Sequence, residues 1–345
     1  MKGKNPWVSF CMSTYKRPEF LQEQISSLLK QTFTDFEIII SDNDPDASAK
    51  AVAESFNDSR VIYQCNNENI GMVKSFNRSL SSSKGEFVTM ITDDDPVYPH
   101  MLETLYRLNT KYPGYGAYYG GCETLCLTRK TAQIMRSKVG INSCLSENMD
   151  WREERIFSGN EFLSLFLTGK LGPLLLWSVG VIKREILVAN GGMPEFGTEF
   201  FTDHAYAIVN CSEKGMAFIN ESLGYQSIHG ENFGFANMDK LEKYKATPES
   251  FFNWVAQRLQ KKEDWAYVKL QLEEFTGRSM VEFSRFLLCS LKLNGKDWKP
   301  FEAARKEVFN STPFLRKWGM KYFLLTKFPF LFSLLLQLKQ KTQKG

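Results

Sequence analysis

The chain lacks the residues that mark several common kinds of protein site. Its 345 residues include only 3 histidines and 7 cysteines, and Cys122 and Cys126 are the only closely spaced cysteine pair. No second pair and no histidine cluster accompanies them, so we do not expect a zinc site. Scattered thiols in odd number are typical of a reducing cytoplasm.

Long apolar runs and a strong net charge are also missing. An apolar stretch at residues 328–338 contains Pro329 and is shorter than the roughly 18 residues that a membrane span needs. Residues 1–5 are polar and have no apolar core of a signal peptide. Lys and Arg total 43 against 39 Asp and Glu, a net charge of +4, which does not indicate nucleic acid as a partner. We therefore expect a cytoplasmic protein that does not bind nucleic acid.

Acidic residues are absent after Glu307, whereas basic and aromatic residues alternate from Arg316 to the end. A basic, aromatic-rich amphipathic segment is typical of a helix that lies on an anionic membrane surface. We therefore predict peripheral contact of this tail with the inner face of the cell membrane. A helix packed on the body of the protein, with its lysines in solvent, is the alternative.

The first hundred residues alternate between strand and helix patterns. Strands are expected at residues 7–12, 36–40, 61–63 and 87–91, and helices at 19–30, 46–56 and 70–80. Such alternation with short connections indicates an α/β fold, with a mostly parallel sheet and helices on both faces.

The pattern changes after residue 115. We expect β structure at 115–128, an irregular loop or lid at 129–151, a helix at 159–168, a strand at 174–179, a helix at 203–214, and short strands at 217–219 and 223–225. Beyond residue 238 the pattern is helical. The predicted domains are 1–237, divided at about 128 into donor and acceptor halves, and a helical C-terminal region at 238–345.

Three acidic residues, Asp93, Asp94 and Asp95, follow the buried strand at 87–91. Adjacent carboxylates repel one another and lose hydration there, so a cation should compensate them. Mg²⁺ or Mn²⁺ suits oxygen ligands, and a metal that also holds a diphosphate would indicate transfer from a nucleotide-linked donor. A capped helix start is the alternative, but it needs only one carboxylate.

Ligands bind at the carboxyl ends of strands in parallel sheets. Three polar loops meet there in the predicted fold, at residues 13–15, 41–44 and 92–95.

Several further motifs follow in order: Asn69-Ile70-Gly71, Gly85-Glu86-Phe87, Pro99 after the acidic run, Gly191-Gly192-Met193, Thr202-Asp203-His204, and Tyr225 to Asn232. Residues 6–235 thereby resemble the family 2 glycosyltransferases of the GT-A (Rossmann-like) fold. The resemblance implies inverting transfer of a sugar from a nucleotide-diphosphate sugar, with UDP favoured, to a glycan or lipid-linked saccharide in surface polysaccharide synthesis.

The resemblance also implies the donor-binding residues: Ser13, Thr14, Tyr15, Asp42, Asp44, Lys74, Asn77 and Asp93. Asp42 is expected to contact the nucleobase, although it or Asp44 can equally form an Asx-turn or cap a helix. Lys74 lies near a position where the family often has an arginine that contacts phosphate. Alternatively, Lys74 lies on a solvent-exposed face of its helix and has no role in binding.

The implied metal ligands for Mn²⁺ or Mg²⁺ are Asp94, Asp95 and His229. Relatives often have Asp-X-Asp-Asp at the acidic run, whereas this chain has Thr92 at the first position, so Asp95 is left either as a second ligand or as a residue facing the acceptor. Asp203 is the implied general base, because one-step inversion needs a carboxylate that takes the proton of the acceptor hydroxyl. A helix N-cap is its alternative role.

Two other functions are compatible with the pattern. A sugar nucleotidyltransferase also uses a carboxylate and metal at a strand end, but it usually begins with a glycine-rich loop, and residues 13–18 contain no glycine. A non-catalytic module that binds a nucleotide sugar or glycan would tolerate loss of Asp203, which is retained here.

Overall fold

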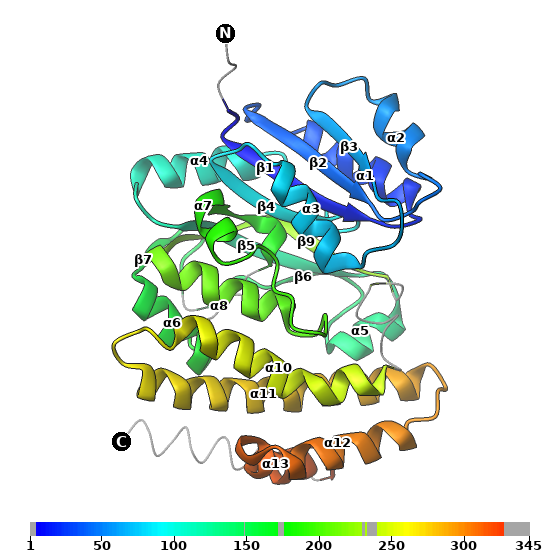
Figure 1. The fold of residues 1–345 in the computed structure, drawn as a ribbon, viewed down its shortest axis with the longest axis vertical. Helices are drawn as coiled ribbons and strands as arrows, with labels where there is room; N and C mark the ends of the chain where they lie inside the picture. The colour runs from blue at the N-terminus through cyan, green and yellow to red at the C-terminus, as the bar shows by residue number, and fades with distance from the viewer. Residues whose placement is uncertain (1–4, 148, 172–175, 230–231, 233–239, 328–345) are drawn as a thin grey trace. The chain divides into compact units, whose positions relative to one another are not determined.

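The computed structural model describes residues 5–147, 149–171, 176–229, 232 and 240–327 (Figure 1). Contacts between Cα atoms divide the chain into two compact units, Met1–Gly230 and Glu231–Gly345. The predicted domain boundary after residue 237 lies outside the described residues.

The first unit begins with parallel strands joined by helices. The elements are β1 (Val8–Thr14), α1 (Pro18–Leu29), β2 (Phe36–Asp42), α2 (Lys50–Ser55), β3 (Val61–Cys65), α3 (Met72–Ser82) and β4 (Phe87–Thr92). The strands read as continuous apolar runs because helices cover both faces of the sheet. Phe10 and Met12 pack into one core with α1 and α2, whereas Cys11 between them packs into a second core with α3.

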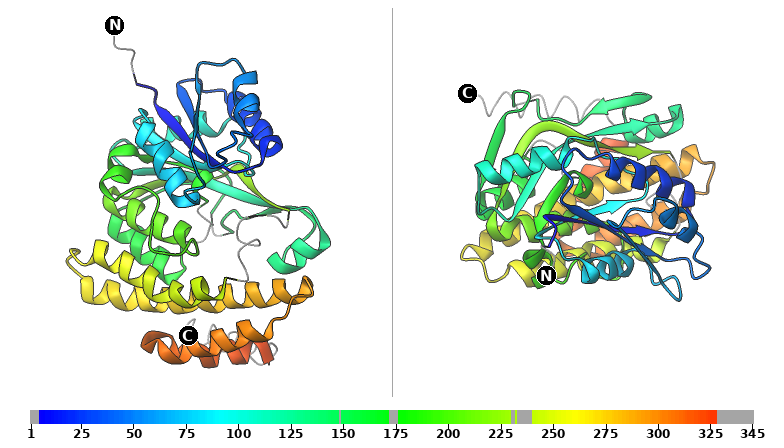
Figure 2. Two further views of the ribbon diagram at one scale, coloured as in Figure 1. Left: turned by 45° about the vertical axis from the view of Figure 1, so that its right-hand side comes forward. Right: turned by 90° about the horizontal axis from the view of Figure 1, so that it is seen from above.

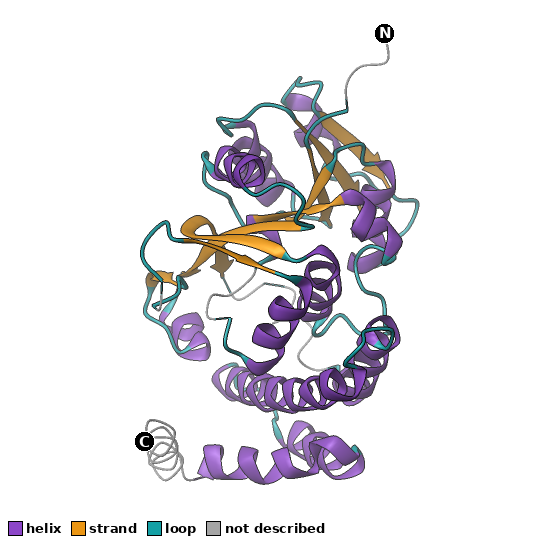
Figure 3. Cartoon of the chain, turned by 90° about the vertical axis from the view of Figure 1, so that its left-hand side faces the viewer, coloured by secondary structure: helices purple, strands orange, loops and turns teal. Residues whose placement is uncertain are grey.

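The second half of this unit adds further strands and helices. They are α4 (Met101–Lys111), β5 (Ala117–Cys126), α5 (Arg129–Met135), β6 (Gly140–Ser143), β7 (Glu154–Phe157), α6 (Gly159–Thr168), the 3₁₀ turn η1 (Trp177–Val179), β8 (Gly180–Lys183), α7 (Arg184–Ala189), α8 (Thr202–Lys214) and β9 (Met216–Ile228). The sheet order is β3-β2-β1-β4-β8-β5-β9-β7, with β6 paired to β5. Only β6, β7 and β8 run against the common strand direction. The predicted fold, a mostly parallel sheet with helices on both faces, is confirmed (Figures 2 and 3).

Several predicted elements are wrong in detail. Residues 129–151 are not an irregular loop, because α5 and β6 lie there, and Thr128 caps α5 reciprocally with Thr131. Of the strand predicted at 174–179, residues 174 and 175 lie outside the described residues, the described end forms the turn η1, and the strand β8 follows it.

The bounds of two other elements differ from their predicted bounds because of local backbone geometry. The helix predicted at 46–56 begins only at Lys50, because Ala47 has a left-handed φ of 54° and its N–H closes a turn onto the Asp44 carbonyl. The two short strands predicted at 217–219 and 223–225 are parts of the single strand β9, whose pairing with β5 shifts register beside Gly121.

The second unit is helical, as expected. It consists of α10 (Leu241–Leu259), α11 (Trp265–Leu293), α12 (Lys299–Ser311), the turn η2 (Pro313–Leu315) and α13 (Arg316–Lys327). The part of the predicted basic tail beyond residue 327 lies outside the described residues. Among the helices that the structure describes, none is both long and apolar enough to cross a membrane.

The strand register brings the polar loops together. Ser13 pairs with Thr92 across β1 and β4, and Thr14 pairs with Asp42 across β1 and β2. The carboxyl ends of these three strands therefore lie in line, and the loops that follow them form one site.

Candidate functional site

Two acidic side chains after β4 lie against the end of β1. Thr14 Oγ1 donates a hydrogen bond of 2.7 Å to Asp93 Oδ2. Arg17 Nη1 lies 3.2 Å from Asp93 Oδ1 and 2.9 Å from Asp94 Oδ2. Both carboxylates are nearly buried, with 5% and 8% of their side-chain surface exposed, while Arg17 is 26% exposed. One guanidinium nitrogen therefore bridges two adjacent buried carboxylates.

The histidine predicted near the metal lies beside the same pair. His229 follows β9, and its Nε2 lies 3.1 Å from Asp94 Oδ2. The His229 ring stacks on the Phe20 ring, with 5.1 Å between their centroids. The Arg17 guanidinium lies 5.4 Å from the centre of the Phe20 ring. The structure thus brings together Asp93, Asp94 and His229 from distant parts of the sequence.

Burial and the positive charge of Arg17 act in opposite directions on the pKa of Asp93. Burial raises the pKa of Asp93 to about 6, and the charge of Asp94 adds to this rise, while Arg17 and Thr14 act against it. Burial lowers the pKa of Arg17, but the two carboxylates outweigh it and leave the pKa above its ordinary value. The Arg17 cation therefore limits the rise in the pKa of Asp93 that burial and Asp94 cause.

Asp95 has protein partners for both of its oxygens. Its Oδ1 accepts from the Ser227 N–H at 3.1 Å, and its Oδ2 accepts from Thr92 Oγ1 at 2.9 Å. Burial and the charge of Asp94 raise its pKa above the ordinary range. Asp95 thus joins the end of β4 to β9, and its role as a metal ligand stays a prediction that these partners do not favour.

The carboxylate of Asp42 lies beneath the loop that follows β2. Its Oδ1 accepts from the Asp44 N–H at 2.9 Å, and its Oδ2 accepts from the Tyr63 hydroxyl at 2.7 Å and the Ala49 N–H at 3.4 Å. Asp44 is also buried, with Lys16 Nζ 4.0 Å from its Oδ1. Both side chains therefore stabilise the loop as Asx-type residues. The contact of Asp42 with a nucleobase and the donor-binding role of Asp44 stay predictions.

The rim of this loop cluster is formed by residues from β1 and the turn after it. Ser13 is partly buried at the strand end, whereas the Tyr15 ring is exposed. Lys16 has a φ of 54°, and its Nζ lies 5.6 Å from the Tyr15 ring centroid. A cavity of about 530 Å³ lies between residues of α2 and β3 and is lined in part by Tyr63.

Lys74 and Asn77 on α3 contact a different part of the chain. Lys74 is exposed, with its Nζ 3.7 Å from Glu195 Oε1. The Asn77 amide donates to the Met193 carbonyl at 3.1 Å and accepts from the Met193 N–H at 2.6 Å. A Cβ on Gly192, whose φ is +77°, would lie 2.2 Å from Asn77 Oδ1. Asn77 therefore holds the turn after α7 against α3, and these contacts do not favour its predicted role or that of Lys74 in donor binding.

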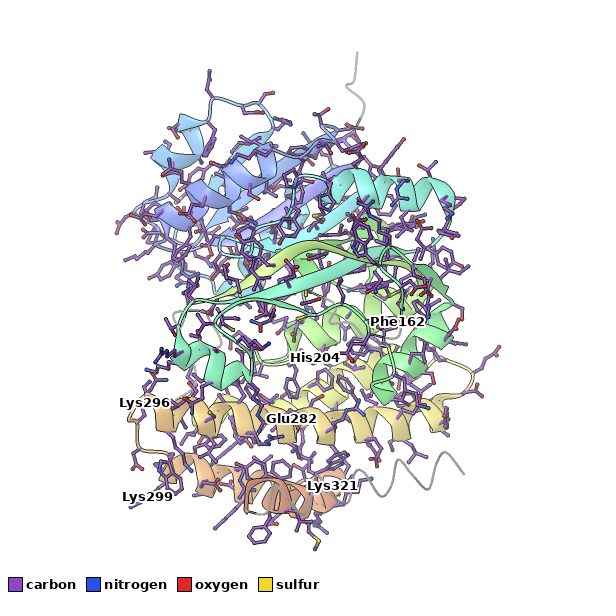
Figure 4. All side chains as sticks on the ribbon, turned by 180° about the vertical axis from the view of Figure 1, so that it is seen from behind. Phe162, His204, Glu282, Lys296, Lys299 and Lys321 are labelled. Carbon is purple, nitrogen blue, oxygen red and sulfur yellow. The ribbon has the colours of Figure 1, made fainter. Side chains whose placement is uncertain are left out.

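Asp203 is the second residue of α8, and the helix begins after Phe201, so the N-cap role does not apply to it. Its side chain is 54% exposed, and its Oδ1 lies 2.8 Å from both the His204 N–H nitrogen and His204 Nδ1. Surrounding protein raises the pKa of Asp203, but the charge and hydrogen bonds of His204 outweigh that effect and lower it overall. Figure 4 labels His204 on α8 and Phe162 on the neighbouring helix α6.

Sequence reasoning gave no role to Arg17 or Tyr63. Arg17 immediately precedes Pro18, which begins α1, and this position at the end of a strand-to-helix loop was the available signal. Tyr63 pairs with Ile40, two residues before Asp42, in a register that only the folded sheet reveals. Within the described ranges, no group of three or more His, Cys, Asp or Glu side chains is arranged to hold a metal.

Comparison with known proteins identifies related sequences. The family model described as "Glycosyl transferase family 2" matches residues 9–123. A Campylobacter jejuni protein named GalNAc(5)-diNAcBac-PP-undecaprenol beta-1,3-glucosyltransferase is 33% identical over 221 residues, covering 63% of this chain and 63% of the relative. The Streptococcus pneumoniae glycosyltransferase GlyG is 32% identical over 104 residues, covering 29% of this chain and 34% of the relative. The chain therefore spans less than two thirds of either relative.

Solved structures share the fold. The structure of S. aureus TarS 1-349 in complex with UDP-GlcNAc has a TM-score of 0.60 and 14% sequence identity, covering 91% of each chain. The structure titled S. aureus TarS has a TM-score of 0.57 and covers 91% of this chain and 55% of that one. At this level of identity the likeness establishes the architecture alone.

Proposed function

Because residues 9–123 match the family model of glycosyl transferase family 2 and the chain has the GT-A fold, we propose that it transfers a sugar from a nucleotide-diphosphate sugar, with UDP favoured, to a hydroxyl of a glycan or lipid-linked saccharide. The observation that carries the proposal is the buried Asp93–Asp94 pair at the end of β4, with Thr14 bonded to Asp93 and His229 beside Asp94. Carboxylates at this edge of a parallel sheet are where a metal-bound diphosphate is held.

The carboxylate of Asp94 and the imidazole of His229 offer donor atoms that fit Mn²⁺ or Mg²⁺. Hard divalent cations prefer carboxylate oxygens, and Mn²⁺ also accepts imidazole nitrogen. Asp94 and His229 lie 3.1 Å apart and would hold the metal. When bound, the metal neutralises the negative charge of the diphosphate leaving group. Asp93, oriented by Thr14, faces the ribose and diphosphate.

The loops after β1 and β2 bind the nucleoside in this proposal. The exposed ring of Tyr15 flanks the base, and Ser13 and Thr14 supply hydroxyl groups beside it. Asp42, held by Tyr63, provides the polar floor of the site with Asp44.

Asp203 acts as the general base. Its carboxylate takes the proton of the acceptor hydroxyl while the oxygen attacks the anomeric carbon and the nucleotide diphosphate departs, which inverts the configuration in one step. The charge and hydrogen bonds of His204 lower the pKa of Asp203 overall, so the carboxylate is ionised at neutral pH. Its 54% exposure leaves room for an acceptor to approach.

A lipid-linked acceptor is favoured over a soluble glycan by two observations. The name of the Campylobacter relative specifies a glycan on undecaprenol diphosphate. Helix α13 also exposes Met320, at 71%, and Phe323, with Arg316 and Lys321 exposed on the same helix. Exposed apolar and cationic side chains on one helix suit an anionic membrane surface. We propose that α13 rests on the inner face of the cell membrane, where such acceptors are elongated.

The membrane contact is tested by vesicle sedimentation. The full chain should pellet with vesicles containing phosphatidylglycerol. Met320→Asp with Phe323→Asp should reduce the pelleted fraction at least about tenfold, because two exposed apolar side chains that the membrane would bury are lost. Tyr267→Asp, at an exposed position of α11, is the matched control and should change little. An unchanged pellet in the double variant rejects the membrane role.

Donor binding is tested by calorimetry with UDP, dTDP, GDP and CDP, first with Mn²⁺ and then with EDTA. We expect one nucleotide to bind only with Mn²⁺ and this binding to be lost in Asp94→Ala. UDP-GlcNAc leads the panel of intact donors, because the structural relative TarS was solved with it. Failure of every nucleotide to bind would contradict the proposal. Binding without any transfer to lipid-linked saccharides would favour a non-catalytic module.

A further inference from the structure

Arg17 and His229 converge on a single oxygen of Asp94. Arg17 Nη1 lies 2.9 Å and His229 Nε2 lies 3.1 Å from Asp94 Oδ2, and the same Nη1 atom lies 3.2 Å from Asp93 Oδ1. A carboxylate oxygen has two lone pairs, so this oxygen is fully occupied. One guanidinium nitrogen thus lies within hydrogen-bond distance of both carboxylates and shares Asp94 Oδ2 with the imidazole.

The His229 imidazole and the Arg17 guanidinium, which both contact Asp94, differ in their ability to coordinate a metal ion. An imidazole nitrogen can itself become a metal ligand, whereas a guanidinium stays protonated and never coordinates. A guanidinium left between the carboxylates would also repel a divalent cation at close range. Arg17 is therefore the group that has to move.

The surroundings of Arg17 allow such a movement. It lies in the loop between β1 and α1 and is 26% exposed, unlike the carboxylates it contacts. Its guanidinium lies over the face of Phe20, at 5.4 Å from the ring centre. The carboxylates, by contrast, are nearly buried, and Thr14 holds Asp93 in place.

We propose that Arg17 is the resident counter-cation of the Asp93–Asp94 pair and that a divalent metal binds only by displacing it. The inference rests on the proposed function for the presence of a metal, and it adds that this chain holds its own metal site closed. The free protein therefore binds Mn²⁺ weakly, and the anionic nucleotide diphosphate, which attracts both the metal and the released guanidinium, opens the site.

The test measures Mn²⁺ binding to the full chain without nucleotide, from the electron paramagnetic resonance signal of free Mn²⁺. Arg17→Gln removes the cation and should bind Mn²⁺ about tenfold tighter than wild type or more. Arg17→Lys keeps a cation and should stay within about twofold of wild type. Arg60→Gln is the matched control, because Arg60 contacts the Asp58 carboxylate at 2.7 Å and is 27% exposed, and it should also match wild type.

Two further variants make the result specific. Adding Asp94→Ala to Arg17→Gln should remove the gained affinity, because the ligand oxygen is lost. If Arg17→Gln does not fold, Arg17→Met provides the same test, since its unbranched apolar chain still packs on Phe20. Mn²⁺ should also raise the melting temperature of the neutral variant more than that of wild type.

The outcomes separate this inference from the proposed function. If wild type binds UDP with Mn²⁺ but Arg17→Gln binds Mn²⁺ alone no tighter than wild type, the counter-cation role is overturned and the proposed function stands. If Mn²⁺ binds to no variant, the acidic pair is not a metal site and the inference fails. If Arg17→Gln gains affinity while no nucleotide binds, the inference holds and the proposed donor chemistry fails.

Discussion

Replacing Asp93 by asparagine should make the metal-free protein more stable at neutral pH. The Asp93 carboxyl is nearly buried, and burial together with Asp94 raises its pKa from the ordinary 3.8 to about 6, with the attraction of Arg17 already included. Each pKa unit corresponds to about 1.4 kcal/mol, so the shift of roughly two units costs the folded state about 3 kcal/mol above pH 7. Asparagine carries no charge and can still accept a hydrogen bond from Thr14, so the variant should recover up to about that amount.

The stability that Asp93→Asn gains over wild type should increase with pH. Because the folded-state pKa of Asp93 lies above the unfolded one, the folded protein takes up the proton first as pH falls from about 6 to 4. Wild-type stability therefore decreases as pH rises through this window, and the full cost is present above it. At pH 5 the cost is about half its value at pH 8, and the advantage of asparagine should shrink accordingly.

Urea denaturation in EDTA at pH 8 and pH 5, followed by tryptophan fluorescence, measures the difference. Asp58→Asn is the control: Asp58 is only partly buried, with 25% of its side chain exposed, and is paired with the equally accessible Arg60, so this change should cost about 1 kcal/mol or less. An Asp93→Asn variant that is no more stable than wild type at pH 8, while the control behaves as stated, would refute the reasoning. The same variant should lose nucleotide affinity, since a functional carboxylate is kept at the expense of stability.

Three further substitutions test other parts of the site. Asp203→Asn should abolish transfer while UDP affinity, measured by calorimetry, stays within about twofold, because the base acts on the acceptor; a collapse of UDP binding would mean that Asp203 is structural. Tyr63→Phe should cost about 1–2 kcal/mol in urea denaturation, because the buried carboxylate it bonds at 2.7 Å loses a donor, and an unchanged midpoint would mean that water or a backbone group replaces it. Gly192→Ala should lower the melting temperature far more than Gly191→Ala, since both have positive φ but only the former places a Cβ against Asn77; equal losses would show that the turn relaxes freely.

Local pattern was enough to predict the framework of this protein. The strands β1, β2 and β4 were recognisable because residues buried on both faces of a parallel sheet form continuous apolar runs, and α1 because its apolar residues recur at helical spacing after Pro18. The loops after parallel strands had to meet at one edge. The strand pattern therefore predicts the acidic loop beside Thr14, and the hydrogen bond from Thr14 to Asp93 confirms it.

Prediction failed where a weak local signal competed with tertiary pairing. The segment 129–151 is polar, yet Thr128 caps a helix there and β6 is stabilised by pairing with β5. The bulged strand β9 reads as two short strands, because its register shift against β5 interrupts the periodicity of its side chains.

The partners of individual side chains were decided only by the tertiary structure. Asp94 and Asp95 are adjacent and chemically identical, but Asp94 meets Arg17 and His229, whereas both oxygens of Asp95 are held within the fold. Adjacent residues at a strand end point in different directions. Asp94 meets Arg17, 77 residues earlier in the chain, and His229, 135 residues later, whereas Asp95 meets the nearby Thr92 and Ser227, 132 residues later. The sequence by itself determined that a cluster of carboxylates would gather at the strand ends. Only the packing of β9 and α1 against that edge decided which carboxylate is available to a ligand, because hydrogen-bond partners are fixed by three-dimensional distance and not by order along the chain.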